Sequence, residues 1–233
     1  MMVDEEEYIE QEEHWVSVSD LMAGLMMVFL LVAIVFMLDM QAERNKIRNV
    51  AVLYDHLRTQ LYLDLKKEFR EDLPNWGAEI NPDLSVRFNR EDLMFHRGET
   101  ELKTEFALIL ADFFPRYVRI ITSDRYREDI TEIRIEGHTS SIWMGVRPDR
   151  AYIFNMELSQ SRTRTTLAYL LALPELDGEI PWIKERLTAN GLSSSKPVMT
   201  AQGEEDIARS RRVEFRLRTD ADARIATILE EAL

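Results

Sequence analysis

The chain has 233 residues, a formal net charge of −13 and no cysteine. The negative charge argues against a general nucleic-acid binder, which needs a basic surface to contact phosphates. The missing cysteine excludes disulfides, thiol nucleophiles and cysteine-ligated zinc sites. The acidic residues gather near the N-terminus, since seven of them lie within residues 4–13, where no basic residue occurs. We interpret residues 1–14 as an acidic tail.

An uncharged run follows this tail. It covers residues 21–38, lies between Asp20 and Asp39, and contains 18 residues. As a helix, such a run covers roughly 27 Å, close to the hydrocarbon thickness of a bilayer. The acidic flank does not fit a signal peptide, which begins with basic residues. The sequence therefore predicts an uncleaved transmembrane helix over residues 15–40 in preference to a buried helix of a soluble domain.

Asp20 stands at the start of the uncharged run, and two interpretations of it remain open. A carboxylate within the bilayer indicates function, because inserting a charge at mid-helix costs about 2.5–3.5 kcal/mol. Alternatively, Asp20 is an N-cap or first-turn acid at the membrane surface, where the helix dipole favours a negative charge.

Apolar residues after the span predict a helix over residues 41–75. They recur at alternating intervals of three and four residues, and are Ile47, Val50, Tyr54, Leu57 and Leu61. This spacing fits a parallel dimer outside the membrane, and it equally fits packing on the chain's own C-terminal domain.

The basic residues that flank the span predict how the protein is oriented in the membrane. Arg44, Lys46 and Arg48 follow the span, whereas no basic residue precedes it. The positive-inside rule alone therefore places the C-terminal domain in the cytoplasm.

The remainder of the chain alternates between strand-like and helix-like patterns. Alternating apolar residues predict strands over residues 84–88, 130–136, 197–201 and 213–217. Amphipathic spacing predicts helices over residues 102–117 and 158–173, and a short helix over residues 182–190 that Gly191 ends. This order predicts an α+β fold in which helices cover one face of a mixed sheet.

Several motifs in this region resemble those of OmpA-like peptidoglycan-binding domains. They occur in the family's order and lie at residues 88–95, 133–139, 155–162 (NMELSQSR), 202–204 and 211–215 (RRVEF). The resemblance covers about residues 84–219. It implies an OmpA-like domain over residues 76–219, and we expect residues 220–233 to form a C-terminal helical tail.

In the family that these motifs resemble, a helix start and an arginine hold the diaminopimelate carboxylate of the peptidoglycan stem peptide. The resemblance assigns the carboxylate to Arg162 and places Phe154, Asn155, Leu158 and Ser159 around the helix start. The alternatives are helix capping for Asn155 and Ser159, core packing for Leu158 and a surface salt bridge for Arg162.

The sequence departs from the family at one position of this site. The family has an aspartate after the Gly-x-Thr turn, where it accepts the ligand's ammonium group, and this chain has Ser140. Asp149, in the longer loop that follows, is a candidate to replace the lost carboxylate.

The N-terminal half resembles a second family. Residues 20–29 (DLMAGLMMVF) resemble the ion-carrying segment of MotB-type stator subunits. Residues 18–26 and the acidic tail together resemble B subunits of Zorya anti-phage defence systems. The resemblance implies an ion-driven rotary motor in which Asp20 carries a proton or sodium ion. It implies a peptidoglycan-anchored homodimer that pairs with a multi-span MotA-like subunit and needs no other cofactor. It places the protein in the bacterial inner membrane, with a cytoplasmic N-terminus and a periplasmic C-terminal domain, against the charge bias.

Three rival functions compete with this motor. A static tether that links a membrane complex to the cell wall would need Arg162 but not Asp20, and a stator subunit of another ion-driven motor is a second alternative. An enzyme has little support, because the four histidines are scattered without a nucleophile, a base or a metal-ligand spacing beside them. We expect no enzymatic activity and no resident metal.

Overall fold

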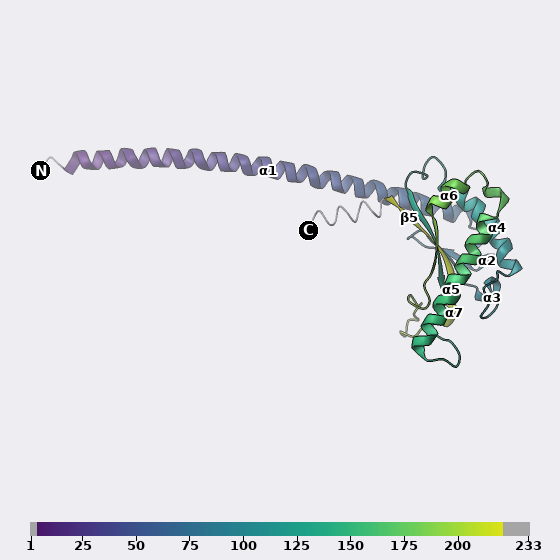
Figure 1. Cartoon of the computed structure of the whole chain (residues 1–233). Helices are drawn as coiled ribbons and strands as arrows, with labels where there is room; N and C mark the ends of the chain where they lie inside the picture. Colours follow the sequence, from purple (N-terminus) through teal and green to yellow (C-terminus); the bar gives the residue numbers. More distant parts are fainter. Residues whose placement is uncertain (1–3, 221–233) are drawn as a thin grey trace. The chain divides into compact units, whose positions relative to one another are not determined.

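The computed structural model describes the backbone of residues 4–220 and the side chains of residues 18–45 and 56–220. The chain divides into two compact units, Met1–Val52 and Leu53–Leu233 (Figure 1). Residues 221–233, which make up nearly all of the predicted C-terminal tail, lie outside the described residues.

The N-terminal unit is part of one long helix, α1 (Asp4–Glu68). Its stretch Val18–Asn45 contains an 18-residue window with a mean hydropathy of 2.9, and none of that window is buried within the chain. Leu21 and Phe36 are among the large apolar side chains that the chain leaves exposed. Such a surface is unfavourable in water and favourable in lipid. The predicted transmembrane helix is thus confirmed.

The end of α1 belongs to the core of the second unit. Leu61, Leu65 and Phe69, one residue beyond the helix, are fully buried there, and Leu57 packs against this core. At these positions the apolar spacing serves packing on the chain's own domain, which was one of the two alternatives. The remaining members of the pattern have side chains outside the described set, and they are Ile47, Val50 and Tyr54.

The second unit contains the predicted mixed sheet. Its five strands are β1 (Ala78–Ile80), β2 (Ser85–Phe88), β3 (Ile130–His138), β4 (Leu187–Gly191) and β5 (Arg212–Thr219). They lie in the order β1-β2-β5-β3-β4, and every neighbouring pair is antiparallel except β3 and β4, which are parallel. The α+β fold with a mixed sheet is therefore confirmed.

The helices of this unit are short, apart from two. They are α2 (Leu73–Trp76), α3 (Glu91–Met94), α4 (Thr104–Ile121), α5 (Pro148–Leu171), the 3-10 turn η1 (Pro174–Leu176), α6 (Ile180–Arg186) and α7 (Ile207–Ser210). Figure 1 shows α4 and α5 on the same side of the strands. Phe113 of α4 packs between Phe88 and Phe215 of the sheet, at ring-centroid distances of 5.3 and 5.2 Å. Aromatic rings thus join the helical layer to the apolar face of the sheet.

Two of the sequence-based element predictions were wrong. The helix predicted over residues 182–190 ends at Arg186, and the chain then forms β4, whose Leu187 and Ala189 pair with Ile133 and Ile135. In place of a strand over residues 197–201, the structure has a single bridge between Met199 and Glu205. The alternating apolar residues at 197–201 therefore belong to a tight antiparallel turn and not to a strand of the sheet.

Gly191 does not end a helix, as the sequence suggested, but allows α5 to approach the sheet. A Cβ atom at Gly191 would overlap the backbone nitrogen of Gln160 in α5. At Gly137, in the neighbouring strand β3, a Cβ atom would lie 2.7 Å from Thr163 Cγ2 and 2.9 Å from the carbonyl oxygen of Ser159. Only glycine lets the backbone of α5 lie this close to β3 and β4.

The opposite face of the sheet carries charged side chains. Glu136 of β3 and Glu214 of β5 are directly paired across the strands, and each is only 1% exposed. Like charges in this position repel each other, and buried charges must be paired. Arg212 Nε lies 2.5 Å and Arg87 Nε 2.8 Å from Glu214 Oε1, while Arg216 Nη2 lies 3.3 Å from Oε2. These three guanidiniums neutralise Glu214, and those of Arg134 and Arg216 each lie 3.6 Å from a carboxylate oxygen of Glu136.

The buried charges shift the protonation equilibria of this network. Burial by itself raises the pKa of Glu214, but the hydrogen bond and positive charge of Arg212 lower it to about 2. Burial also opposes ionisation of Glu136, yet His138 and Arg216 hold its pKa below the usual value. Burial lowers the pKa of His138, and the charge of Arg212 adds to that effect. At neutral pH, both carboxylates are charged and the imidazole is neutral.

We predict that Gly191→Ala destabilises the protein by about 1–3 kcal/mol, as overpacking of a tight contact does. The added methyl group meets the backbone of Gln160, which cannot move aside as a flexible side chain would. Urea unfolding followed by the fluorescence of the buried Trp76 and Trp182 measures the change. Gly178→Ala is the matched control, because no atom lies within 4 Å of the added methyl, and it should leave the midpoint nearly unchanged.

We also predict that acid destabilises the fold. The unfolded chain binds a proton at His138 near pH 6.5, whereas the folded chain resists it, so stability falls below about pH 6.5. Glu214 is protonated near pH 4.3 when unfolded and near pH 2 when folded, so its contribution is lost across that interval. The urea midpoint should therefore fall below about pH 6.5 because of His138, and fall further below about pH 4.3 because of Glu214. A midpoint that stays constant or rises as the pH falls contradicts these shifted pKa values.

Candidate functional site

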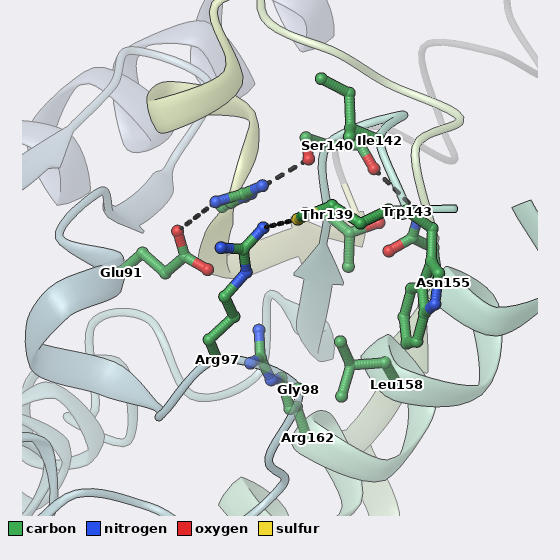
Figure 2. Close-up of a pocket in the computed structure, with 12 residues that line it drawn as sticks. Glu91, Arg97, Gly98, Thr139, Ser140, Ile142, Trp143, Asn155, Leu158 and Arg162 are labelled. Atoms are coloured by element: carbon green, nitrogen blue, oxygen red, sulfur yellow. Dashed lines mark hydrogen bonds and ion pairs between the residues drawn. The ribbon is translucent and has the colours of Figure 1, made fainter. Parts of the chain in front are cut away.

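A pocket of about 170 Å³ lies among α3, the turn after β3 and α5 (Figure 2). Its charged and amide lining consists of Glu91, Arg97, Asn155, Arg162 and Arg211. In Figure 2, Glu91 and Arg97 reach in from one side, and Trp143 and Asn155 lie on the other. The pocket is smaller than the roughly 300–1,000 Å³ of drug-sized sites, so it suits the end group of a larger ligand.

Helix α5 supplies three of the lining residues but not its N-terminus. The helix begins at Pro148, after the extended Arg147, so Asn155 lies about two turns inside it. The predicted helix start near Asn155 is thus wrong. A proline in the first turn followed by an acid is a helix-start signal that lies at Pro148 and Asp149. None of residues 147–150 lines the pocket, so anion binding there depends on side chains.

Arg162 is the most firmly held cation of the pocket. Its side chain is 7% exposed, and Nε and Nη2 donate to the carbonyl oxygens of Glu99 and His96 at 2.9 and 3.0 Å. Its guanidinium carbon lies 4.7 Å from the ring centre of Phe95. Among the described residues it forms no ion pair, which contradicts the surface salt bridge considered as an alternative. Burial lowers the pKa of Arg162, but a guanidinium stays charged in proteins.

These contacts orient Arg162 while leaving capacity for a ligand. The two carbonyl oxygens accept hydrogen bonds from Nε and Nη2. Nη1 donates no hydrogen bond to any group in the part of the chain that the structure describes. A guanidinium with fixed orientation and a spare edge is well suited to a carboxylate.

The other predicted site residues divide into two groups. Asn155 and Leu158 line the pocket, and Asn155 Nδ2 donates to the carbonyl oxygen of Ser140 at 3.1 Å. Ser159 instead supports the fold, because its hydroxyl accepts from the backbone nitrogen of Ser193 at 3.1 Å. Phe154 is 38% exposed and packs beside Trp143, with 5.4 Å between ring centres, but it does not line the pocket. The structure therefore brings together Asn155, Leu158 and Arg162.

Three further charged residues of the pocket were not predicted. Arg211 Nε donates to Ser140 Oγ at 3.0 Å, and its Nη1 donates to Glu91 Oε2 at 2.8 Å. Arg97 donates to Met144 Sδ at 3.2 Å. Glu91 and Arg211 lie in the motifs at residues 88–95 and 211–215, so the signal was present in the sequence. Their convergence on Ser140 depends on long-range packing.

One group of side chains elsewhere has the composition of a metal site. Glu136, His138 and Glu214 each offer one ligand atom within 4.8 Å of the others. However, Arg212 and Arg216 already bind the two oxygens of Glu214. Guanidiniums in these positions repel a cation, so the donor set fits an ion-pair network and is poorly suited to a metal.

Asp20 lies directly before the apolar residues 21–38 of α1. Because α1 starts at Asp4, Asp20 is neither an N-cap nor a first-turn residue. The helix-cap interpretation is therefore excluded, and Asp20 is a carboxylate in a continuous helix at the edge of its apolar stretch. Its side chain is exposed in the isolated chain, so a partner or the membrane surface must provide its surroundings.

Comparisons with known proteins agree with this architecture. No protein-family model matches the chain. The Zorya protein ZorB of Escherichia coli is 48% identical over 224 residues, which are 95% of this chain and 94% of that protein. A MotB-like protein from Desulfovibrio vulgaris has a solved structure that matches with a TM-score of 0.53 and 25% identity, over 72% of this chain and 98% of its own.

The first of these similarities extends over nearly the whole chain, and the second extends over almost three quarters of it. The structure independently shows an N-terminal membrane span and a mixed sheet with the OmpA-like motifs in place. The chain therefore belongs to the family of the Zorya protein ZorB, and its C-terminal domain has the MotB-like, OmpA-like fold.

Proposed function

We propose that the chain is the cell-wall-anchored stator subunit of an ion-driven motor in an anti-phage defence system. The observation that carries the wall-anchoring half is the pocket around Arg162. A buried arginine, oriented by two carbonyl oxygens and leaving one edge unused, stands beside Asn155 in the motif that resembles the peptidoglycan-binding family. It is suited to the carboxylate of a peptidoglycan stem peptide.

The motor half of the proposal rests on Asp20. An ionisable residue inside a membrane span is expensive and indicates an ion pathway. In the proposed cycle, Asp20 binds a proton or sodium ion, which neutralises it and removes the cost of its burial against a partner. One elementary charge that crosses about 100 mV supplies roughly 2.3 kcal/mol, which can bias the partner between two conformations.

The proposed assembly follows from these two roles. A wall ligand exists only outside the inner membrane, so the C-terminal domain is periplasmic and residues 1–14 are cytoplasmic. We propose a homodimer that works with a multi-span MotA-like, ZorA-type subunit. That partner also explains how Arg44, Lys46 and Arg48 sit on the outer side against the positive-inside rule, because a helix that folds with a partner bundle need not follow its own flanking charges.

The strongest rival is a static tether, which anchors a membrane complex to the wall without moving ions. It needs the pocket but gives Asp20 no role. The position of Asp20 directly before the apolar residues 21–38 of a continuous helix favours the motor, since a tether needs no ionisable group at the membrane.

We predict that Asp20→Asn abolishes protection of cells against phage while the protein still inserts and assembles with its partner. The amide has nearly the same shape but cannot alternate between a charged and a neutral form. Plaque assays with equal membrane levels of both proteins measure the effect. Asp39→Asn is the matched control, because Asp39 lies at the other end of the uncharged run. Full protection by Asp20→Asn would leave the static tether as the better account.

A further inference from the structure

The pocket contains a carboxylate, but it does not come from the position after the Gly-x-Thr turn, where the family has its aspartate. Ser140, after the turn that follows β3, contributes only a hydroxyl and a carbonyl oxygen. Asp149 belongs to the first turn of α5 and does not line the pocket. Among the described residues, Glu91 at the start of α3 is the one carboxylate in the pocket wall.

Glu91 is linked to Ser140 by one guanidinium. Arg211 donates from Nη1 to Glu91 Oε2 at 2.8 Å and from Nε to Ser140 Oγ at 3.0 Å. This bridge fixes the Glu91 side chain with one oxygen bound. The second oxygen, Oε1, has no hydrogen bond in the part of the chain that the structure describes, and the side chain is 27% exposed. Figure 2 shows Glu91 directed toward the pocket.

The charges of the pocket suit a ligand with two opposite charges. Arg97 and Arg162 form no direct ion pair among the described residues, whereas Arg211 is paired with Glu91. A carboxylate therefore fits at Arg162 and Arg97. An ammonium group would be repelled by three guanidiniums unless it bound the free oxygen of Glu91. Glu91 and Arg162 also interact electrostatically, so the negative group and the positive group belong to one site.

We propose that Glu91 is the acceptor for the ammonium group of the ligand, which we take to be an amino-acid end group that carries an ammonium beside a carboxylate. In this arrangement the carboxylate binds Arg162 and the ammonium binds Glu91 Oε1. This assignment rests on the proposed wall-anchoring function and specifies which residue selects the ligand's positive charge.

The test uses the full chain in detergent and two peptides. One is a peptidoglycan stem tripeptide that ends in meso-diaminopimelate, and the other is the same peptide with its side-chain amine acetylated. Isothermal titration calorimetry measures both dissociation constants. We expect Glu91→Gln to weaken binding of the amine peptide by about tenfold or more, the size of a lost charge-assisted hydrogen bond. The acetylated peptide should bind wild type and Glu91→Gln equally.

A rescue variant and a control sharpen this test. In Glu91→Gln/Ser140→Asp, a carboxylate returns beside Arg211, and affinity for the amine peptide should recover. Asp149→Asn should bind both peptides like wild type.

If wild type and Glu91→Gln bind the amine peptide equally, the assignment of Glu91 is overturned, while the wall-anchoring function is not. An equal loss for both peptides also overturns it, because Glu91 would then act only by holding Arg211. If wild type binds neither peptide, wall anchoring fails and the Glu91 assignment fails with it.

Discussion

The C-terminal domain depends on the close contact between α5 and the parallel pair β3 and β4. Gly137 and Gly191 form the flat surface on which the helix lies, and a side chain at Gly191 would overlap the helix backbone. This contact also sets the height and rotation of α5 over the sheet. Because Asn155 and Arg162 lie on this helix and Thr139 follows β3, the same contact determines where the pocket forms.

The opposite face of the same sheet holds a network of buried charges. Two carboxylates, Glu136 and Glu214, stand side by side with almost no access to water, and arginines from β2 and β5 neutralise them. The motif RRVEF joins both faces, because Arg211 reaches the ligand pocket while Arg212 and Glu214 belong to the ion network. The same short segment therefore contributes one residue to the pocket and two residues to the ion network that stabilises the sheet.

The sequence predicted those features that local pattern determines. The apolar run identified the span, and alternation identified β2, β3 and β5. It failed at β4, because five residues of a parallel edge strand end in a glycine that looks like a helix stop. It placed the start of α5 too late, because the first two turns of the helix, from Pro148, precede the apolar periodicity at residues 158–173. Glu91 and Arg211 are 120 residues apart in sequence, and no local pattern shows that they meet.

Binding to the cell wall is the claim on which the stator, the tether and the ligand assignment all depend. Its most direct measurement is co-sedimentation of the full chain, in detergent, with purified sacculi. We predict that the wild-type protein pellets with sacculi, that free meso-diaminopimelate releases it, and that Arg162→Ala remains in the supernatant while still folded. A wild-type protein that stays in the supernatant, or an Arg162→Ala variant that pellets as well as wild type, would contradict the account.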